Sequence, residues 1–186
     1  MGKTKTLMTA HEFFQTEFPE EEKWEVVAGE LILSPAPNVR HQLVLGELSR
    51  QLGNWLLNHP VALKVSDWDV EFQLDETRRP DLVVALKKNN RLRIDTHGHG
   101  TPDFIVEILS PGQAHRDLGD KKDLYERCGV LEYWVVDYAK RRIHQFLPGK
   151  DGRYVETLVA RGSVKSKVLA GFAVRLKELF KVLDEV

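Results

Sequence analysis

The hydrophobic positions of this chain repeat in two ways, one typical of strands and the other of helices. Nearly continuous runs of β-forming residues at 82–86 and 104–109 predict central strands that are covered on both faces. Apolar residues at helical spacing predict a helix over about 39–58, another from 116 or 117 to 128, and a short one after Gly171. Further strand-like pieces are expected at 61–65, 70–74, 131–137, 141–147 and 153–160, and a hairpin over 24–34.

The segments between these elements carry boundary signals. Thr9 and Glu12 form a capping box ahead of a short helix, and Gly129 can close the helix that ends near 128. We expect a charged turn at 75–79 and a loop at 89–100, since His97 and His99 have no partner at a recognised metal-ligand spacing. Residues 1–8 are expected to form a loose tail, and no linker divides the chain, so 1–186 is expected to be a single domain.

Composition restricts the functional classes. The chain has 186 residues, 42% apolar and 30% charged, which is ordinary for a soluble globular protein. Its net charge of −1 provides no global positive field, so any nucleic acid must be bound by a local patch. Cys128 is the only cysteine, which excludes an internal disulfide and a cysteine-based metal site. With no secretory signal and no long apolar run, a cytoplasmic location is expected.

Two carboxylates interrupt the most apolar strands. Glu107 lies in the middle of the 104–109 run, where a charge is costly unless it is paired, hydrogen-bonded or bound to a metal. Asp81 follows Pro80 at the start of the 82–86 strand, where it could also be a simple turn residue. Strand alternation places Asp103 on the face of Glu107, although the start of a strand is expected to be exposed.

A lysine lies in the apolar stripe of the helix that follows. At about 100° per residue, Lys121 falls among Leu124, Tyr125 and the other apolar positions, whereas Lys122 points about 100° away. Asp117 lies four residues earlier on nearly the same face. An inward lysine needs acidic partners, and Asp81 and Glu107 are the candidates; the alternative is a side chain that extends its charged end back to water.

Two other polar residues are auxiliary candidates. His41 falls at the centre of the apolar stripe of the 39–58 helix, near its N-terminus, where it could face a phosphate or simply be a satisfied core residue. Glu25 lies in the first half of the 24–34 hairpin and could equally be an exposed strand residue.

The order of elements and these residues resemble the PD-(D/E)XK superfamily, and more closely its Uma-type family of restriction endonucleases. The resemblance extends from WEVVAGELILSPAP to GFAVRLKELF, and its most specific pieces are RPDLVV, PDFIVEILSPG and RDLGDKKDLYERCGVLEYWVVD. It implies an α/β (α+β) restriction-endonuclease-like fold. A mixed central sheet would be flanked by helices, with an N-terminal hairpin and a C-terminal β-hairpin extension.

The resemblance also implies residue roles. Asp81 matches the first acid of the superfamily and Glu107 the second, while Leu109 stands where the superfamily places its lysine. In the Uma-type family that lysine lies on the next helix, in a stretch shaped like Asp-Leu-X-X-Lys-X-X-Leu-Tyr, which matches Asp117 and Lys121. Family resemblance and helical phase therefore select the same lysine.

These residue types suit phosphodiester hydrolysis. The reaction needs a hard cation, Mg²⁺ or Mn²⁺, for which Asp81, Glu107 and the carbonyl of Ile108 would be the ligands, and Lys121 would orient water and stabilise charge on the phosphate. DNA is the expected substrate, and a homodimer is expected because cutting both strands takes two sites. The rival interpretation is a nucleic-acid-binding or protein-interaction module with a weak or inactive nuclease fold.

The expected contacts to DNA phosphates come from one basic cluster near the Asp81 strand. It consists of Arg78, Arg79, Lys87 and Lys88. Charge runs of this kind are more often solvated faces than binding sites.

Overall fold

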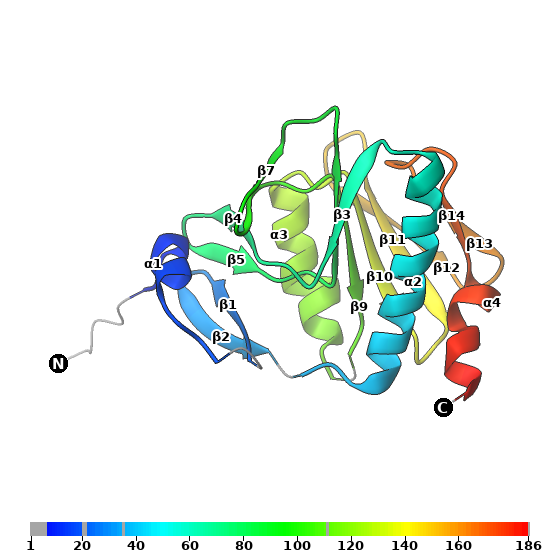
Figure 1. The fold of residues 1–186 in the computed structure, drawn as a ribbon, viewed down its shortest axis with the longest axis horizontal. Helices are drawn as coiled ribbons and strands as arrows, with labels where there is room; N and C mark the ends of the chain where they lie inside the picture. The colour runs from blue at the N-terminus through cyan, green and yellow to red at the C-terminus, as the bar shows by residue number, and fades with distance from the viewer. Residues whose placement is uncertain (1–6, 20–21, 35, 111, 186) are drawn as a thin grey trace.

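Two six-stranded sheets, a two-stranded sheet and the helices around them make up the fold (Figure 1). The six-stranded sheet with the longer strands is called the larger sheet and the other the smaller sheet. The computed structural model describes residues 7–19, 22–34, 36–110 and 112–185. The tail predicted at 1–8 lies outside the described residues except for Leu7 and Met8, and the Met8 N–H donates to the Gly29 carbonyl at 2.8 Å. None of the described helices combines the length and the apolar character that crossing a membrane requires.

The larger sheet contains the strands that the apolar runs predicted. Its order is β12-β11-β10-β9-β6-β3. β9 and β10 run parallel and the other neighbours antiparallel, which makes it the mixed sheet expected for this fold class. The bounds are Ala62–Ser66 for β3, Leu82–Leu86 for β6, Phe104–Ile108 for β9, Glu132–Asp137 for β10, Arg142–Pro148 for β11 and Tyr154–Val159 for β12.

Strand alternation divides the core of the larger sheet into two faces. Leu82 and Val106 pack with the apolar stripe of α2 (Val39–Asn58), whereas Val83 and Ile105 pack with α3 (Lys121–Arg127). Side chains two residues apart on a strand share a face, so Glu107 lies on the same side as Ile105. The pleat of β9 therefore points this carboxylate at α3.

The smaller sheet has the order β2-β1-β5-β4-β8-β7 and lies beside α1 (Ala10–Gln15) in Figure 1. The predicted hairpin is formed by β1 and β2, and its turn residues Ala28 and Gly29 both have positive φ. The strands are β1 Lys23–Val27, β2 Glu30–Ser34, β4 Val70–Gln73, β5 Glu76–Arg78, β7 Leu92–Ile94 and β8 Gly98–Gly100.

Three short strands of this sheet were not predicted. β5 lies where a charged turn was expected at 75–79, and β7 and β8 lie inside the expected loop at 89–100. Each of these strands has only three residues. β5 pairs with the distant β1 and β8 with the distant β4, and β7 pairs with β8. Such segments form strands because their partners supply the hydrogen bonds, so their own composition gives no signal.

The helices match their predicted positions, with one difference in geometry. The Thr9–Glu12 capping box is present in α1, and the side chain of Asn38 caps α2. The first turn of the third helix, Arg116–Asp120, is a π-helix, in which the Lys121 N–H donates to the Arg116 carbonyl five residues back. α3 then continues as a regular helix up to Gly129, whose φ is +75°.

The C-terminal segment completes the cover of the larger sheet. β13 (Ser163–Lys165) and β14 (Ala173–Arg175) form an antiparallel pair that was not predicted; the hairpin expected from the strands at 131–137 and 141–147 is formed by β10 and β11. α4 (Leu176–Leu179) and the 3₁₀-helix Phe180–Glu185 follow, and Leu176, Leu179 and Phe180 pack into the same core as α2.

Candidate active site

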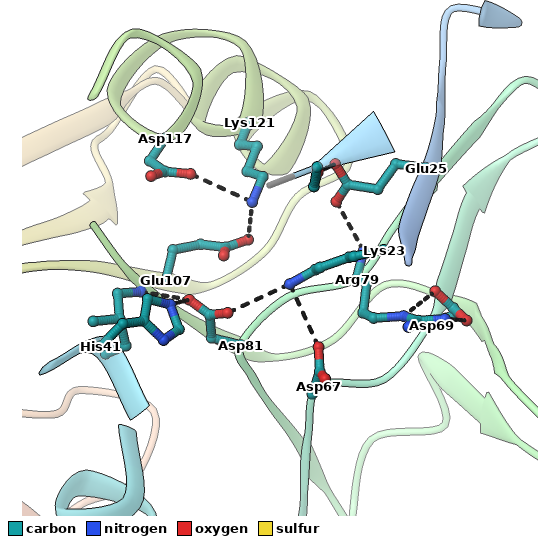
Figure 2. A network of polar contacts seen from close by, with 12 residues as sticks. Lys23, Glu25, His41, Asp67, Asp69, Arg79, Asp81, Glu107, Asp117 and Lys121 are labelled. Carbon is teal, nitrogen blue, oxygen red and sulfur yellow. Dashed lines mark hydrogen bonds and ion pairs between the residues drawn. The ribbon is translucent and has the colours of Figure 1, made fainter. Parts of the chain in front are cut away.

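Asp81, Glu107 and Lys121 converge in one pocket, where β6 begins and β9 ends beside α3 (Figure 2). The Lys121 Nζ lies 2.9 Å from Glu107 Oε1 and 3.3 Å from Asp117 Oδ1. The Ile108 N–H donates to Asp81 Oδ2 at 2.7 Å, which links the two strands that carry the acids. The antiparallel β6 and β9 place the start of one strand beside the end of the other, which brings Asp81 close to Glu107.

The carboxylate of Asp81 is held in its ionised form. His41 Nε2 lies 3.0 Å from Oδ2 and the Lys23 Nζ 3.5 Å from Oδ1. Burial alone raises the pKa of Asp81, but the hydrogen bond from His41 and the positive charge of Lys23 outweigh it, so the pKa falls below its ordinary value. His41 is itself 4% exposed, and this contact with Asp81 is the basis on which it remains an auxiliary candidate.

Glu107 has the opposite electrostatic balance. Burial raises its pKa most, Lys121 lowers it, and the nearby charges of Asp81 and Asp117 raise it again, to about 8. Oε1 accepts from the Tyr125 hydroxyl at 2.8 Å and faces Lys121, while Oε2 has no hydrogen bond within the part of the chain that the structure describes. The raised pKa shows that Lys121 does not fully offset the burial of Glu107 and the negative charges of Asp81 and Asp117.

Lys121 is held as a cation. Burial lowers its pKa, but the charges of Glu107, Glu25 and Asp117 outweigh this effect, and the net pKa is raised well above that of a free lysine. Lys122 points elsewhere, as its helical phase predicted, and its Nζ lies 2.6 Å from Asp123 Oδ1.

The remaining auxiliary candidates also lie in or beside the pocket. Asp117 lines it, and Glu25 is 1% exposed behind it, so the alternative of an exposed strand residue is excluded for Glu25. Glu25 Oε2 accepts from Arg116 at 2.6 Å, and Oε1 accepts from the Arg79 backbone N–H at 3.0 Å. Burial raises the pKa of Glu25, but Lys121, Lys23 and the Arg79 N–H together outweigh burial, so the net pKa is lowered to about 2.

Sequence reasoning missed three residues at this site. Lys23 and Arg116 line the pocket, and the Tyr125 hydroxyl donates to Glu107. Lys23 precedes Glu25 by two residues on β1, so strand alternation applied to Glu25 would have identified it. Tyr125 was treated as an apolar stripe residue, although a buried tyrosine hydroxyl usually requires a partner.

The four predicted phosphate-binding residues do not form one surface. Arg78 is 3% exposed and lies 2.6 Å from Glu76, and the Arg79 side chain binds Asp69. Lys87 and Lys88 are exposed at the opposite end of β6, which at about 3.3 Å per residue places them roughly 17 Å or more from Arg79.

The expectation of an exposed Asp103 was wrong. Its side chain is 1% exposed and accepts hydrogen bonds from the Leu86 N–H at 2.7 Å and from Asn89 at 2.8 Å. Asp103 is hydrogen-bonded to the C-terminal end of β6 and does not line the pocket.

The raised pKa of Glu107 predicts how stability depends on pH. The folded protein holds a proton on Glu107 up to about pH 8, whereas the unfolded chain releases it near pH 4.5. The contribution of Glu107 to the free energy of unfolding of the metal-free protein is therefore expected to be complete below pH 4.5 and to be lost as the pH rises to about 8, whereas Glu25, whose pKa is lowered to about 2, loses its contribution as the pH falls below 4.5. Urea denaturation at several pH values checks this, and the loss should be smaller in Glu107→Gln. An equal pH dependence in both proteins would contradict it.

Comparisons with known proteins identify the family and the fold. The model of the Uma2 family, described as "Putative restriction endonuclease", matches residues 10–177. An uncharacterised protein of Synechocystis sp. (strain ATCC 27184 / PCC 6803 / Kazusa) is 26% identical over 156 residues, which cover 83% of this chain and 88% of that protein. The crystal structure of a "putative nuclease belonging to DUF820" from Anabaena variabilis ATCC 29413 shares the fold. Its TM-score is 0.79 at 20% identity, over 95% of this chain and 99% of that one.

Proposed function

The chain belongs to the Uma2 family of putative restriction endonucleases, and we propose that it is a divalent-metal-dependent endonuclease that hydrolyses phosphodiester bonds of DNA. The observation that carries the proposal is the convergence of two acids and a buried lysine in one pocket, from β6, β9 and α3. A structural ion pair would need one acid for the lysine, and this pocket provides several.

The donor atoms of the pocket fit a hard cation. Asp81 and Glu107 offer carboxylate oxygens, and Oε2 of Glu107 has no hydrogen bond among the described residues. The N–H and C=O of one strand residue point toward the same neighbouring strand, so the carbonyl of Ile108 faces the side of Asp81 as its N–H does. Mg²⁺ and Mn²⁺ favour such oxygen ligands, and when bound there the ion would supply Lewis acidity and charge neutralisation at the phosphate.

The protein's own groups position the reaction. His41 and the Ile108 N–H fix the carboxylate of Asp81, and Tyr125 fixes that of Glu107. Because Lys121 remains protonated, its role is to orient water and stabilise negative charge on the phosphate, and it is not the base that removes a proton.

Phosphate contacts near the acids are assigned to residues that line the pocket. Lys23 and Arg116 are each 18% exposed there. Arg79 also lines the pocket with its side chain 25% exposed and keeps this role, whereas Arg78 does not, since its side chain is buried against Glu76.

The direct test is incubation of supercoiled plasmid and of single-stranded DNA with the protein and Mg²⁺ or Mn²⁺. We expect nicked or linear plasmid with either ion, none with a chelator, and none with Asp81→Ala. Cleavage that survives chelation would contradict metal dependence. DNA that is bound but never cut would support the rival binding module.

Metal binding should also be visible without any substrate. The ion binds the native state and relieves the repulsion between Asp81 and Glu107, so saturating Mg²⁺ is expected to raise the melting temperature of the wild-type protein. In the double variant Asp81→Asn/Glu107→Gln the Mg²⁺ shift should disappear. An identical melting temperature for the wild type with and without Mg²⁺ would count against this metal site.

A further inference from the structure

A second cluster of potential metal ligands lies in the smaller sheet, and neither family membership nor the proposed nuclease reaction uses it. It consists of Glu71 on β4, His97 in the turn before β8, and His99 on β8, whose ligand atoms all lie within 4.8 Å of one another. The parallel pairing of β4 with β8 places Glu71 opposite His99. Glu71 precedes His99 by 28 residues, which is why the sequence showed no partner for the two histidines.

His97 has a nitrogen that lacks a hydrogen-bond partner. Its Nε2 is buried and unpaired among the described residues, and it lies 3.8 Å from Glu71 Oε2. The other ring nitrogen, Nδ1, lies 3.2 Å from the Thr96 hydroxyl, which accepts from it in the tautomer that has the proton on Nδ1. In that tautomer the lone pair of Nε2 faces a carboxylate oxygen, and a cation between the two would satisfy both.

A stacked ring fixes the position of the His97 imidazole. Phe14 of α1 stacks on it with centroids 3.4 Å apart and planes at 16°.

His99 is oriented in the way that histidine ligands usually are. Its Nδ1 lies 2.8 Å from Glu71 Oε2, and its Nε2 lies 3.3 Å from Asp95 Oδ1. A carboxylate that accepts from the outer ring nitrogen fixes the tautomer and makes the inner nitrogen available to a metal. Asp95 would therefore act as the partner of a ligand and not as a ligand.

The backbone between the two histidines is adapted to this arrangement. A Cβ at Gly98 would lie 3.0 Å from the Trp68 ring and 3.2 Å from Leu92 and Val70 side-chain atoms. The glycine lets the strand lie close against these side chains, which keeps His97 and His99 facing Glu71.

We propose that Glu71, His97 and His99 form a binding site for a Zn²⁺-class transition-metal ion. Two imidazole nitrogens and one carboxylate oxygen are ligands that suit Zn²⁺, whereas Mg²⁺ prefers oxygen alone. Ligands 2.0–2.1 Å from a tetrahedral ion are separated by about 3.3 Å. The observed separations from Glu71 Oε2, 2.8 Å and 3.8 Å, lie on either side of that value, and all three ligand atoms lie within 4.8 Å of one another, so side-chain adjustments without backbone rearrangement would complete the site.

The fourth position of the ion faces solvent, because Glu71 and His99 are each 26% exposed. The ion would join β4 to β8 and, through the Phe14 stack on His97, would hold α1 against the smaller sheet. Its role is therefore structural, and it is separate from the all-oxygen pocket at Asp81.

Calorimetric titration of the chelator-treated full chain with ZnCl₂ and with MgCl₂ tests the proposal. We expect one Zn²⁺ per chain in the wild type and equally in Asp81→Asn/Glu107→Gln, which removes the acids of the other pocket. His97→Gln/His99→Gln should weaken binding about 100-fold or more, whereas His59→Gln, which removes an exposed histidine stacked on Trp55, should not. Zn²⁺, but not Mg²⁺, should also raise the melting temperature of Asp81→Asn/Glu107→Gln.

The proposal is overturned if Zn²⁺ gives no heat of binding to the wild type. It is also overturned if Asp81→Asn/Glu107→Gln abolishes binding while His97→Gln/His99→Gln retains it.

Should the double histidine variant not fold, as judged by circular dichroism, two measurements replace it. The single variant Glu71→Gln should weaken binding, and Co²⁺ bound to Asp81→Asn/Glu107→Gln should show the intense visible absorption of a tetrahedral site. A weak octahedral spectrum, or full affinity in Glu71→Gln, contradicts the site. None of these readouts depends on nuclease activity.

Discussion

Replacing Lys121 by methionine is expected to lower the rate of DNA cleavage about 100-fold or more, with little change in DNA affinity. The substitution keeps most of the apolar stem, which is 9% exposed, and removes the charge that faces Glu107 and Asp117. If that charge acts only on the developing negative charge of the phosphate, the loss falls on turnover and not on binding. Single-turnover cleavage and a separate DNA-binding measurement distinguish the two.

The neighbouring lysine provides a matched control. Lys122→Met removes the same charge one residue away, where Nζ pairs with Asp123, and is expected to be nearly neutral. Introducing a lysine with Leu109→Lys in the Lys121→Met background is expected to restore part of the activity, because Leu109 shares the face of Glu107 and stands at the superfamily's lysine position. Wild-type cleavage by Lys121→Met, or a loss confined to Lys122→Met, would refute the assignment.

Asp81→Asn is expected to reduce cleavage about 1000-fold, close to the background without enzyme. The amide preserves the size of the side chain, and its oxygen can still accept from the Ile108 N–H, so the fold should remain intact. What disappears is the negative charge that binds a divalent cation. Plasmid cleavage over a range of Mn²⁺ concentrations measures the loss, and higher Mn²⁺ should restore little of it.

Asp67→Asn is the control for this second substitution. Asp67 lines the same pocket, and its side chain is 60% exposed and lies 3.4 Å from Lys23. Removal of this solvated charge should change cleavage less than about tenfold. Equal losses in both variants would mean that general electrostatics of the pocket, and not ligation by Asp81, controls the reaction.

The sequence by itself determined the larger sheet and its principal helices. Local patterns predicted these elements: β6 and β9 come from short apolar runs, and α2 comes from apolar residues at helical spacing. The same local logic identified Glu107 and Lys121, because a charge in an apolar strand or stripe conflicts with its surroundings. Helical phase was sufficient to separate Lys121 from Lys122.

Tertiary structure decided how those charges are distributed among partners. The sequence could not show that Lys23 reaches Asp81, because β1, which carries Lys23, and β6, which begins directly after Asp81, belong to different sheets. Arg78 and Glu76 are two residues apart on β5, but their burial depends on the pairing of β5 with β1 and β4. The short strands β5 and β8 likewise depend on hydrogen bonds that the distant strands β1 and β4 supply, and β7 pairs with β8.

The cluster of Glu71, His97 and His99 shows the same division most clearly. The two histidines are separated by one residue in the sequence. The third proposed ligand, Glu71, comes from β4, which only the parallel pairing with β8 brings beside them. Periodicity reports which face a side chain occupies. Which group it meets there depends on the register of strands far apart in the chain, and this register is set by the packing of the whole domain.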